Sequence, residues 1–260
     1  MYKLGFIGLG NMAGALIKGF ISSGYLNKND ICGFDISEKA RIKAGESGIY
    51  ICSNNQETVN KSELIIIAVK PQYIEDAVAK IKDNLKGKAF VSVVLGYDFE
   101  KYENLLDNSV RHLTIMPNTP VEVGEGMILL EEKHSLREEE WKFIKEGLEK
   151  CGSIEVIPSH LMSAAGALSG CGPAYLYMVI EALADGAVKN GIPRKTAYKL
   201  ASQTVIGAGK MQLISGIHPG VLKDNVTSPG GSTIKGLKAL EDGNIRAAFI
   251  NAIDQGCQIQ

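Results

Sequence analysis

The sequence predicts an α/β protein whose N-terminal domain has a mostly parallel sheet with helices on both faces, followed by an all-α domain. First, the apolar run Lys3–Ile7 leads directly into a glycine-rich turn and a helical pattern. Second, runs rich in β-branched residues alternate with amphipathic helical patterns as far as Pro158. Third, no strand pattern follows Pro158. We therefore expect an α/β domain over residues 1–157 and a helical domain over residues 158–260.

The N-terminal turn has the pattern Gly-x-Gly-x-x-Ala at Gly8–Ala13. Gly8 permits a tight turn, Gly10 lets a pyrophosphate approach the backbone, and Ala13 lets the helix pack close to the strand. The pattern alone is weak evidence. Because it stands between an apolar strand and an amphipathic helix, it predicts a dinucleotide-binding domain of the Rossmann type.

The apolar run Ile31–Phe34 ends in Asp35, about 20 residues past the glycines, where an acidic residue commonly binds the adenine ribose of NAD. In that role Asp35 would repel the 2′-phosphate of NADP. Alternatively, Asp35 only caps the next helix, a role that Ser37 could fill equally well. The sequence leaves both interpretations open.

Two further apolar runs, Ile65–Val69 and Ala89–Leu95, predict buried parallel strands. Ligands bind at the carboxyl edge of such a sheet. We expect Val69–Pro71 and Val94–Gly96 to face the cofactor there, with Asn55 in a turn on the same edge. Other predicted elements are strands at 113–116, 127–130 and 154–156, a rigid loop at 117–120 and a helix from 137 to 151.

The second half predicts helices over residues 159–170, 173–190, 194–215, 231–241 and 243–257. The segment 173–190 is apolar nearly all round, which is typical of a helix buried on every side. A domain of about 100 residues has little room for such a helix. We therefore expect this domain to complete its core with another subunit through a C2 interface. The alternative is a lone compact bundle.

A second glycine-rich stretch, Ser228–Thr233, precedes the helical pattern that begins near Ile234. Ser232 or Thr233 is expected to cap that helix. The backbone N–H groups at a helix start, with partial positive charge and glycines beside them, predict a small anion site with a hydroxyl nearby. The alternative is an ordinary capped helix start.

Composition excludes several classes of function. The net charge of −1 provides no electrostatic basis for binding nucleic acid or an anionic membrane. Five scattered cysteines without a C-x-x-C pair argue against a disulfide framework and a metal site, and they suit the cytoplasm. The N-terminus lacks a signal-peptide pattern. No apolar run is expected to span a bilayer, because Glu181 and Asp185 interrupt the longest one.

Several stretches together resemble one family, pyrroline-5-carboxylate reductase. They are FIGLGNMA at 6–13, AVKPQ at 68–72, MPNTP at 116–120, SGCGPAY at 169–175, ASQTVIGAGKM at 201–211 and HPGVLKDNVTSPGGSTIKGL at 218–237. The resemblance covers essentially the whole chain, in order. The last motif is highly specific, whereas many dehydrogenases share the first.

The resemblance implies a Rossmann domain followed by an all-α dimerisation domain, assembled as an interlocked dimer or a ring of dimers. It implies reduction of Δ1-pyrroline-5-carboxylate to L-proline by NADPH or NADH, the last step of proline synthesis. Carried over by motif, the cofactor contacts are Ile7, Gly8, Leu9, Gly10, Asn11, Met12, Asn55, Ala68, Val69, Lys70, Pro71 and Asn225. The substrate contacts are Gly230, Gly231, Ser232 and Thr233.

These residue types suit the reaction. Backbone N–H groups of Gly230–Ser232 can hold the substrate carboxylate, and Thr233 Oγ1 can form a hydrogen bond with the ring nitrogen. The motif contains no His, Asp or Glu that would be an obvious general acid. We therefore expect catalysis by positioning a hydride donor against an iminium, with Thr233 as the catalytic residue.

Three departures from the family pattern affect the details. Members often have Ser at the position of Cys171, and many carry Glu where this chain has Ser215–Ile217. Asp35 replaces the small or basic residues of NADP-preferring members, so we expect NADH to be well used.

Two other functions compete. A β-hydroxyacid dehydrogenase needs a general base, usually a Lys on an early helix of the second domain, but Lys189 is late in its helix. A non-catalytic dinucleotide sensor would have no reason to keep the SPGGST stretch.

Overall fold

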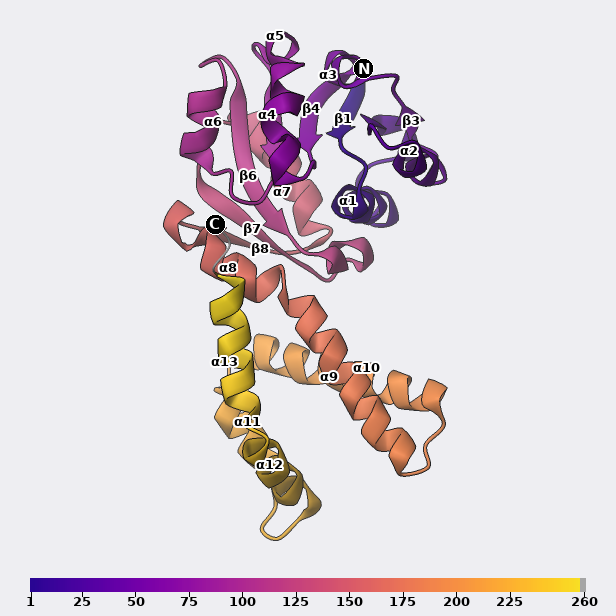
Figure 1. Ribbon diagram of the computed structural model, residues 1–260, viewed down its shortest axis with the longest axis vertical. Coiled ribbons are helices and arrows are strands. Elements are labelled where there is room, and N and C mark those ends of the chain that lie inside the picture. The colour runs from indigo at the N-terminus through magenta and orange to yellow at the C-terminus, as the bar shows by residue number, and fades with distance from the viewer. Residues whose placement is uncertain (258–260) are drawn as a thin grey trace. The chain divides into compact units, whose positions relative to one another are not determined.

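A computed structural model describes residues 1–257 and shows two compact units (Figure 1). The first unit comprises Met1–Cys171 together with Gly256 and Cys257, and the second comprises Gly172–Gln255. The predicted domain division after Ile157 stays a prediction. The helix α8 (Met162–Ser169), which that division assigns to the second domain, packs on the sheet of the first unit.

The first unit contains an eight-stranded sheet with the strand order β3-β2-β1-β4-β5-β6-β7-β8. The strands are β1 (Tyr2–Ile7), β2 (Ile31–Phe34), β3 (Tyr50–Ile51), β4 (Ser62–Ile67), β5 (Ala89–Ser92), β6 (Arg111–Pro117), β7 (Gly126–His134) and β8 (Gly152–Ile157). All neighbouring strands are parallel except β6 and β7. The order changes direction between β1 and β4, and ligands bind at the carboxyl ends of strands beside such a point.

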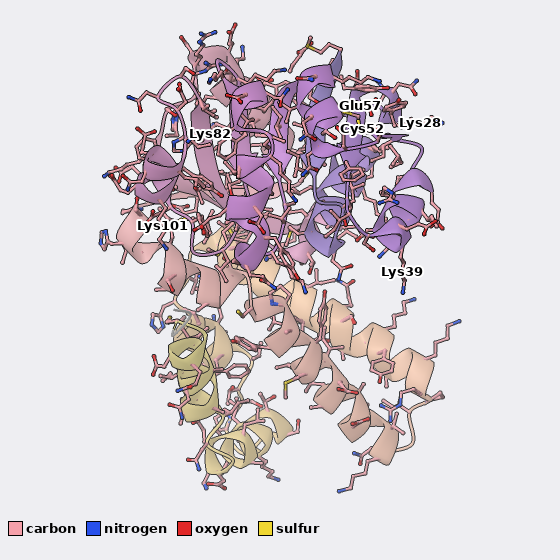
Figure 2. The ribbon with its side chains drawn as sticks, turned by 45° about the horizontal axis from the view of Figure 1, so that its top comes forward. Lys28, Lys39, Cys52, Glu57, Lys82 and Lys101 are labelled. Atoms are coloured by element: carbon pink, nitrogen blue, oxygen red, sulfur yellow. The ribbon has the colours of Figure 1, made fainter. Side chains whose placement is uncertain are left out.

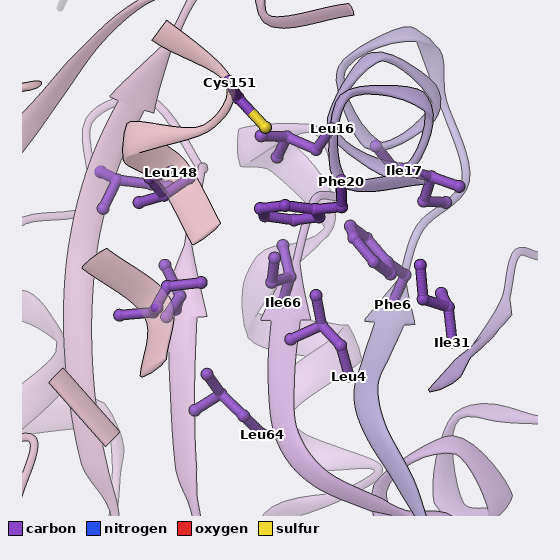
Figure 3. Packing of buried hydrophobic residues seen from close by; sticks show 14 of the residues in the cluster. Leu4, Phe6, Leu16, Ile17, Phe20, Ile31, Leu64, Ile66, Leu148 and Cys151 are labelled. Atoms are coloured by element: carbon purple, nitrogen blue, oxygen red, sulfur yellow. The ribbon is translucent and has the colours of Figure 1, made fainter. Parts of the chain in front are cut away.

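Helices cover both faces of this sheet, as the sequence predicts. They are α1 (Asn11–Ser22), α2 (Glu38–Gly45), α3 (Asn55–Lys61), α4 (Ile74–Ala79), α5 (Lys82–Leu85), α6 (Phe99–Leu105), α7 (Glu138–Glu149) and α8, with short 3₁₀ turns between them. Leu64 and Ile66 of β4 pack with Phe20 of α1 on one face (Figure 3). Ile65 and Ile67 pack in a separate cluster on the other face. Alternation along one fully buried strand therefore supplies both halves of the core.

The second unit consists of α9 (Gly172–Lys189), α10 (Arg194–Ser215), α11 (Pro219–Asn225), α12 (Ser232–Asp242) and α13, which begins at Ile245 and ends at Gly256 of the first unit. Helices α9 and α10 pack against each other. Ala184 is the only buried residue of α9, whereas Met178 is 70% exposed. Within a single chain α10 covers only part of the surface of α9, which agrees with the expectation that another subunit completes this core.

The stretch Ser159–Lys189 is long and apolar enough to cross a membrane by length and composition alone. The expectation that no stretch reaches this limit was too strict, because the charged Glu181 and Asp185 lie near one end of it. Two separate helices, α8 and α9, make up most of the stretch. Apolar side chains left exposed on a helix can equally be covered by another protein subunit.

Three local features differ from the predicted elements. The short strand β3 and the helix α11 were not predicted. The strand β5 ends at Ser92, three residues before the predicted end at Leu95, and Ser92 Oγ accepts a hydrogen bond from the N–H of Val94 at 3.1 Å. The N–H of Val93 still donates to the carbonyl oxygen of Ile67 at 3.0 Å, so the chain leaves the sheet after Val93.

Candidate functional site

Gly8 begins the turn that follows β1, and its backbone demands glycine. Its φ is +91°, and a Cβ atom there would lie 2.6 Å from the carbonyl oxygen of Ala68. The N–H of Gly8 donates to the carbonyl oxygen of Phe34 at 2.8 Å. The turn is thereby attached to the ends of both β2 and β4.

Gly10 is the N-cap of α1, and the space beside it is open. A Cβ atom at Gly10 would meet nothing within 4 Å. Gly10 and Asn11 are exposed, Ile7 and Leu9 are buried, and Met12 is half-buried. Because glycine has no side chain to cap the helix, the N–H groups of the first turn stay available to an anion. This arrangement matches the predicted pyrophosphate site.

Asp35 lies beside this turn and is bound to it. Its Oδ2 accepts a hydrogen bond from the N–H of Leu9 at 2.7 Å, and its Oδ1 accepts one from the N–H of Ser37 at 2.7 Å. Ser37, not Asp35, is the N-cap of α2, because its Oγ accepts from the N–H of Ala40. The interpretation of Asp35 as the helix cap is therefore wrong. Its role toward the adenine ribose stays a prediction.

Arg41 places a positive charge at the same corner of the sheet. Its Nη1 donates to the carbonyl oxygens of Asp35 at 2.7 Å and Ile36 at 3.1 Å. The guanidinium lies 5.5 Å from the centroid of the Phe34 ring. The corner therefore contains both an acidic and a basic side chain, and Arg41 is a residue that the sequence reasoning did not single out.

The second predicted cofactor stretch, Ala68–Pro71, follows β4 at the same edge. The N–H of Ala68 donates to the carbonyl oxygen of Ile7 at 2.8 Å. Lys70 is exposed, and Pro71 begins a 3₁₀ turn. Asn55 was expected in a turn, but it is the first residue of α3, because Asn54 caps that helix through the N–H of Glu57 at 2.8 Å.

A cavity of about 210 Å³ lies at the carboxyl ends of β5 and β6. Its wall includes the predicted stretch Val94–Gly96, together with Tyr97 and the buried carboxyl group of Glu131. Burial raises the pKa of Tyr97, and the hydrogen bond of its hydroxyl to Glu75 at 2.9 Å raises it further.

The predicted substrate loop lies in the second unit, before α12. Gly230 has a φ of +70°, and Gly231 is the N-cap of the helix. Ser232 and Thr233 are the first two helical residues, so the expectation that one of them caps the helix is wrong. Both are exposed in the single chain. A glycine cap leaves the N–H groups of the first turn available, as the predicted anion site requires.

Asn225, the remaining predicted cofactor contact, is the exposed last residue of α11. It belongs to the second unit, as do Gly230–Thr233. The other predicted contacts, Ile7–Met12, Asp35, Asn55 and Ala68–Pro71, belong to the first unit. Of these, Ile7–Met12, Asp35 and Ala68–Pro71 lie at one edge of the sheet, because β1 pairs with β2 on one side and with β4 on the other.

Asn118 is a buried polar residue that the sequence reasoning assigned only to a rigid loop. Its Oδ1 accepts from the N–H of Met127 at 2.9 Å, and its Nδ2 donates to the carbonyl oxygen of Ser169 at 2.9 Å. It therefore ties the end of β6 to β7 and α8. The sequence carried no specific signal for this role, because Asn and Pro are common turn residues.

The next feature is the arrangement of side chains that commonly bind metal ions. Among residues 1–257 no three His, Cys, Asp or Glu side chains form a group that could hold a metal ion. The five cysteines are free, and Cys171 is half-buried.

Comparison with known proteins identifies the family. Over 254 residues the chain is 41% identical to a pyrroline-5-carboxylate reductase of Arabidopsis thaliana, with 97% of this chain and 92% of that protein covered. The enzyme of the same description from Methanosarcina acetivorans is 40% identical over 253 residues, covering 96% and 94%. The chain belongs to the pyrroline-5-carboxylate reductase family.

The family matches also follow the two halves of the chain. Residues 159–259 match the family described as pyrroline-5-carboxylate reductase dimerisation, and residues 3–96 match the one described as NADP oxidoreductase coenzyme F420-dependent. Among solved structures, the pyrroline carboxylate reductase of Plasmodium falciparum with NADP bound superimposes with a TM-score of 0.90 at 33% identity. That match covers 99% of this chain and 96% of the other. The predicted dimerisation domain is thereby confirmed as a family feature.

Proposed function

We propose that this protein reduces Δ1-pyrroline-5-carboxylate to L-proline with NADPH or NADH, as the final step of proline biosynthesis. One imine, one reduced nicotinamide and one proton give one amine and one oxidised nicotinamide. The proposal rests above all on the glycine-capped start of α12, in a chain that belongs to this family along its whole length. This helix start provides an anion site with a hydroxyl group beside it, as the substrate requires.

The nucleotide half fits a dinucleotide cofactor. Gly8 makes a turn that no other residue could make without strain, and Gly10 leaves open space in front of the first turn of α1. The residues that would hold the cofactor are Ile7–Met12, Asp35, Asn55, Ala68–Pro71 and Asn225. When bound, NADPH or NADH supplies the hydride.

The substrate half fits a small ring that carries a carboxylate. The N–H groups of Gly230 and Ser232 would bind that carboxylate, because a helix start carries partial positive charge, while the N–H of Gly231 donates to the carbonyl oxygen of Ser228 at 3.1 Å and holds the loop. Thr233 Oγ1 would hold the ring nitrogen and so orient the carbon of the C=N bond. Positioning of this kind can remove several kcal/mol from a barrier, about 7–11 in the best-oriented systems.

Self-association is part of the same proposal. The family matched by residues 159–259 is a dimerisation domain, and α9 and α10 expose large apolar side chains such as Met178, Leu213 and Ile214. We infer a dimer or a ring of dimers, with Δ1-pyrroline-5-carboxylate as the small-molecule partner and no nucleic acid or membrane. A cytoplasmic location agrees with the five free cysteines.

The test is an assay of the purified protein with Δ1-pyrroline-5-carboxylate and either NADPH or NADH, following nicotinamide absorbance and the formation of L-proline. We expect substrate-dependent oxidation of the cofactor and one proline per nicotinamide oxidised. A protein that binds NADPH but forms no proline would contradict the proposal. A panel of β-hydroxyacids and other cyclic imines would then identify the substrate.

A further inference from the structure

The turn Gly96–Phe99 joins β5 to α6 at the carboxyl edge of the sheet, and side chains outside the turn hold it at both ends. Thr114 Oγ1 donates to the carbonyl oxygen of Tyr97 at 3.1 Å. Lys101, an exposed residue of α6 (Figure 2), donates from Nζ to the carbonyl oxygen of Gly96. The turn also forms part of the wall of the 210 Å³ cavity.

The strongest attachment of this turn is a buried carboxyl group. Both oxygens of Glu131 accept hydrogen bonds from the N–H of Phe99, at 3.1 and 3.0 Å. Its Oε1 also accepts a hydrogen bond from Ser159 Oγ at 2.6 Å. All three bonds have Glu131 as the acceptor, which is what a carboxylate requires.

Burial makes this arrangement unusual. The side chain of Glu131 is 0% exposed, whereas the next residue, Glu132, is exposed on the opposite face of β7. A buried carboxylate is costly unless hydrogen bonds compensate it, and a fully satisfied buried network holds its members rigidly. Glu131 therefore restrains the segments that it joins.

The strand beside Glu131 is irregular at the same level. The pairing of β6 with β7 shifts register between Leu113, which pairs with His134, and Ile115, which pairs with Leu130, so residues 131–133 of β7 lie opposite Thr114 alone. Such irregularities re-aim side chains and often occur next to active sites. Here the side chain of Thr114 is directed at Tyr97, one residue of the turn that Glu131 also binds.

The two segments that Glu131 joins follow different strands of the sheet. Phe99 begins the helix after β5, and Ser159 begins the 3₁₀ turn after β8. Both Glu131 and Ser159 line the cavity together with Val94–Gly96. One carboxyl group thus joins two walls of the cavity, at the carboxyl edge of the sheet where Val94–Gly96 are expected to face the cofactor.

We propose that Glu131 is a positioning residue for hydride transfer, which acts by fixing the turn Gly96–Phe99 and the start of the segment at Ser159 as the wall that seats the nicotinamide ring. The inference rests on the proposed function. Glu131 acts through the N–H of Phe99 and the hydroxyl of Ser159 and does not itself touch the reactants. Its loss should therefore weaken and misplace the cofactor without affecting the substrate loop.

The test compares Glu131→Gln with the matched control Glu132→Gln, its exposed neighbour on β7. The amide keeps the size of the side chain but replaces one accepting oxygen by an NH₂ group that cannot accept a hydrogen bond. For E131Q we expect the Kd for NADPH to rise about tenfold and kcat to fall about tenfold, since a misplacement of about 1 Å is enough to slow catalysis substantially. The KM for Δ1-pyrroline-5-carboxylate should stay within about twofold. E132Q should match the wild type.

Two readouts separate positioning from mere stability. The Kd is measured by nicotinamide fluorescence, which requires no turnover, and the melting temperature is measured in parallel. A lower melting temperature with unchanged Kd and kcat would overturn the inference. If E131Q does not fold, Ser159→Ala removes one of the three bonds, and an unchanged Kd for NADPH in that variant would overturn it as well.

The experiment also distinguishes this inference from the proposed function. A wild-type protein that makes no proline would contradict the function, while the Kd comparison would still decide whether Glu131 shapes the cofactor wall. Normal wild-type turnover with identical Kd and kcat in E131Q would leave the function intact and refute the role of Glu131.

Discussion

The sheet unit and the helical unit differ in how much of their apolar surface a single chain can bury. In the sheet unit, Ile65–Ile67 of β4 are 0% exposed and pack on both faces. In the helical unit, α9 buries only Ala184, and Leu213 and Ile214 of α10 are 74% and 75% exposed. The first unit completes its core alone, whereas the second presents a surface that fits the dimerisation domain of its family.

The two candidate binding elements differ in the same way. The cofactor turn stands on buried strands, and Gly8 is fixed by contacts with two neighbouring strands. The substrate loop stands at an exposed helix start, where none of the residues of α12 is buried. Variants that separate cofactor binding, substrate binding and assembly therefore test the comparison directly.

The largest effect is expected from a charge on the exposed face of α9. Met178→Asp would bury an unpaired carboxylate in the subunit interface, at a cost of several kcal/mol, and we expect a monomer in analytical ultracentrifugation. Ile42→Asp is the matched control, because Ile42 is 62% exposed in α2 of the sheet unit. A dimer that survives M178D would show that this face is not the interface.

The two glycines of the cofactor turn should respond differently to alanine. Gly8→Ala is expected to destabilise the protein by at least about 2 kcal/mol in urea unfolding, because its φ is +91° and the new Cβ would meet Ala68. Gly10→Ala meets nothing in the protein, so it should leave stability nearly unchanged and weaken NADPH binding by about tenfold. Equal NADPH affinity in G10A and the wild type would remove Gly10 from the site.

Removing the hydroxyl of the substrate loop should affect transition-state stabilisation alone. Thr233→Ala is expected to cost about 1–3 kcal/mol in kcat/KM for the imine, the usual cost of leaving a polar partner unpaired. The Kd for NADPH should stay unchanged, in contrast to G10A. An unchanged kcat/KM would exclude Thr233 from the mechanism.

The smallest effect concerns the choice between the two cofactors. Asp35→Ser removes a negative charge beside the glycine turn and should shift preference from NADH towards NADPH by about 1 kcal/mol. Asp35→Asn is the control for shape, because it removes the charge and keeps one accepting oxygen for the N–H of Leu9. A wild type that already prefers NADPH strongly would show that Asp35 does not bind the ribose.

Local patterns predicted much of the fold and of the candidate site. The strand-turn-helix from β1 to α1 follows from neighbouring residues, because the turn needs glycine at Gly8 and open space at Gly10. The same holds for the paired glycines before α12 and for the buried run of β4. Small and β-branched residues influence the backbone conformation of their near neighbours in the sequence. Their effect can therefore be predicted from the sequence alone.

Contacts between distant segments could not be predicted in this way. The hydrogen bonds from Leu9 to Asp35, from Asn118 to Ser169 and from Phe99 to Glu131 join residues 26, 51 and 32 positions apart. The apolar pattern of α9 predicted burial without showing what would bury it. A side chain's partner depends on strand order and register, which no local pattern contains.

The sequence by itself therefore determined the classes of local structure, the positions of the glycine turns and the family. Only the tertiary structure decided that Asp35 holds the glycine turn and that a buried Glu131 joins two walls of the cavity. The physical reason is the separation in sequence between the residues that interact. Backbone conformation is set by adjacent residues, whereas the cost of burying a polar group is met only by donors that the fold brings from elsewhere.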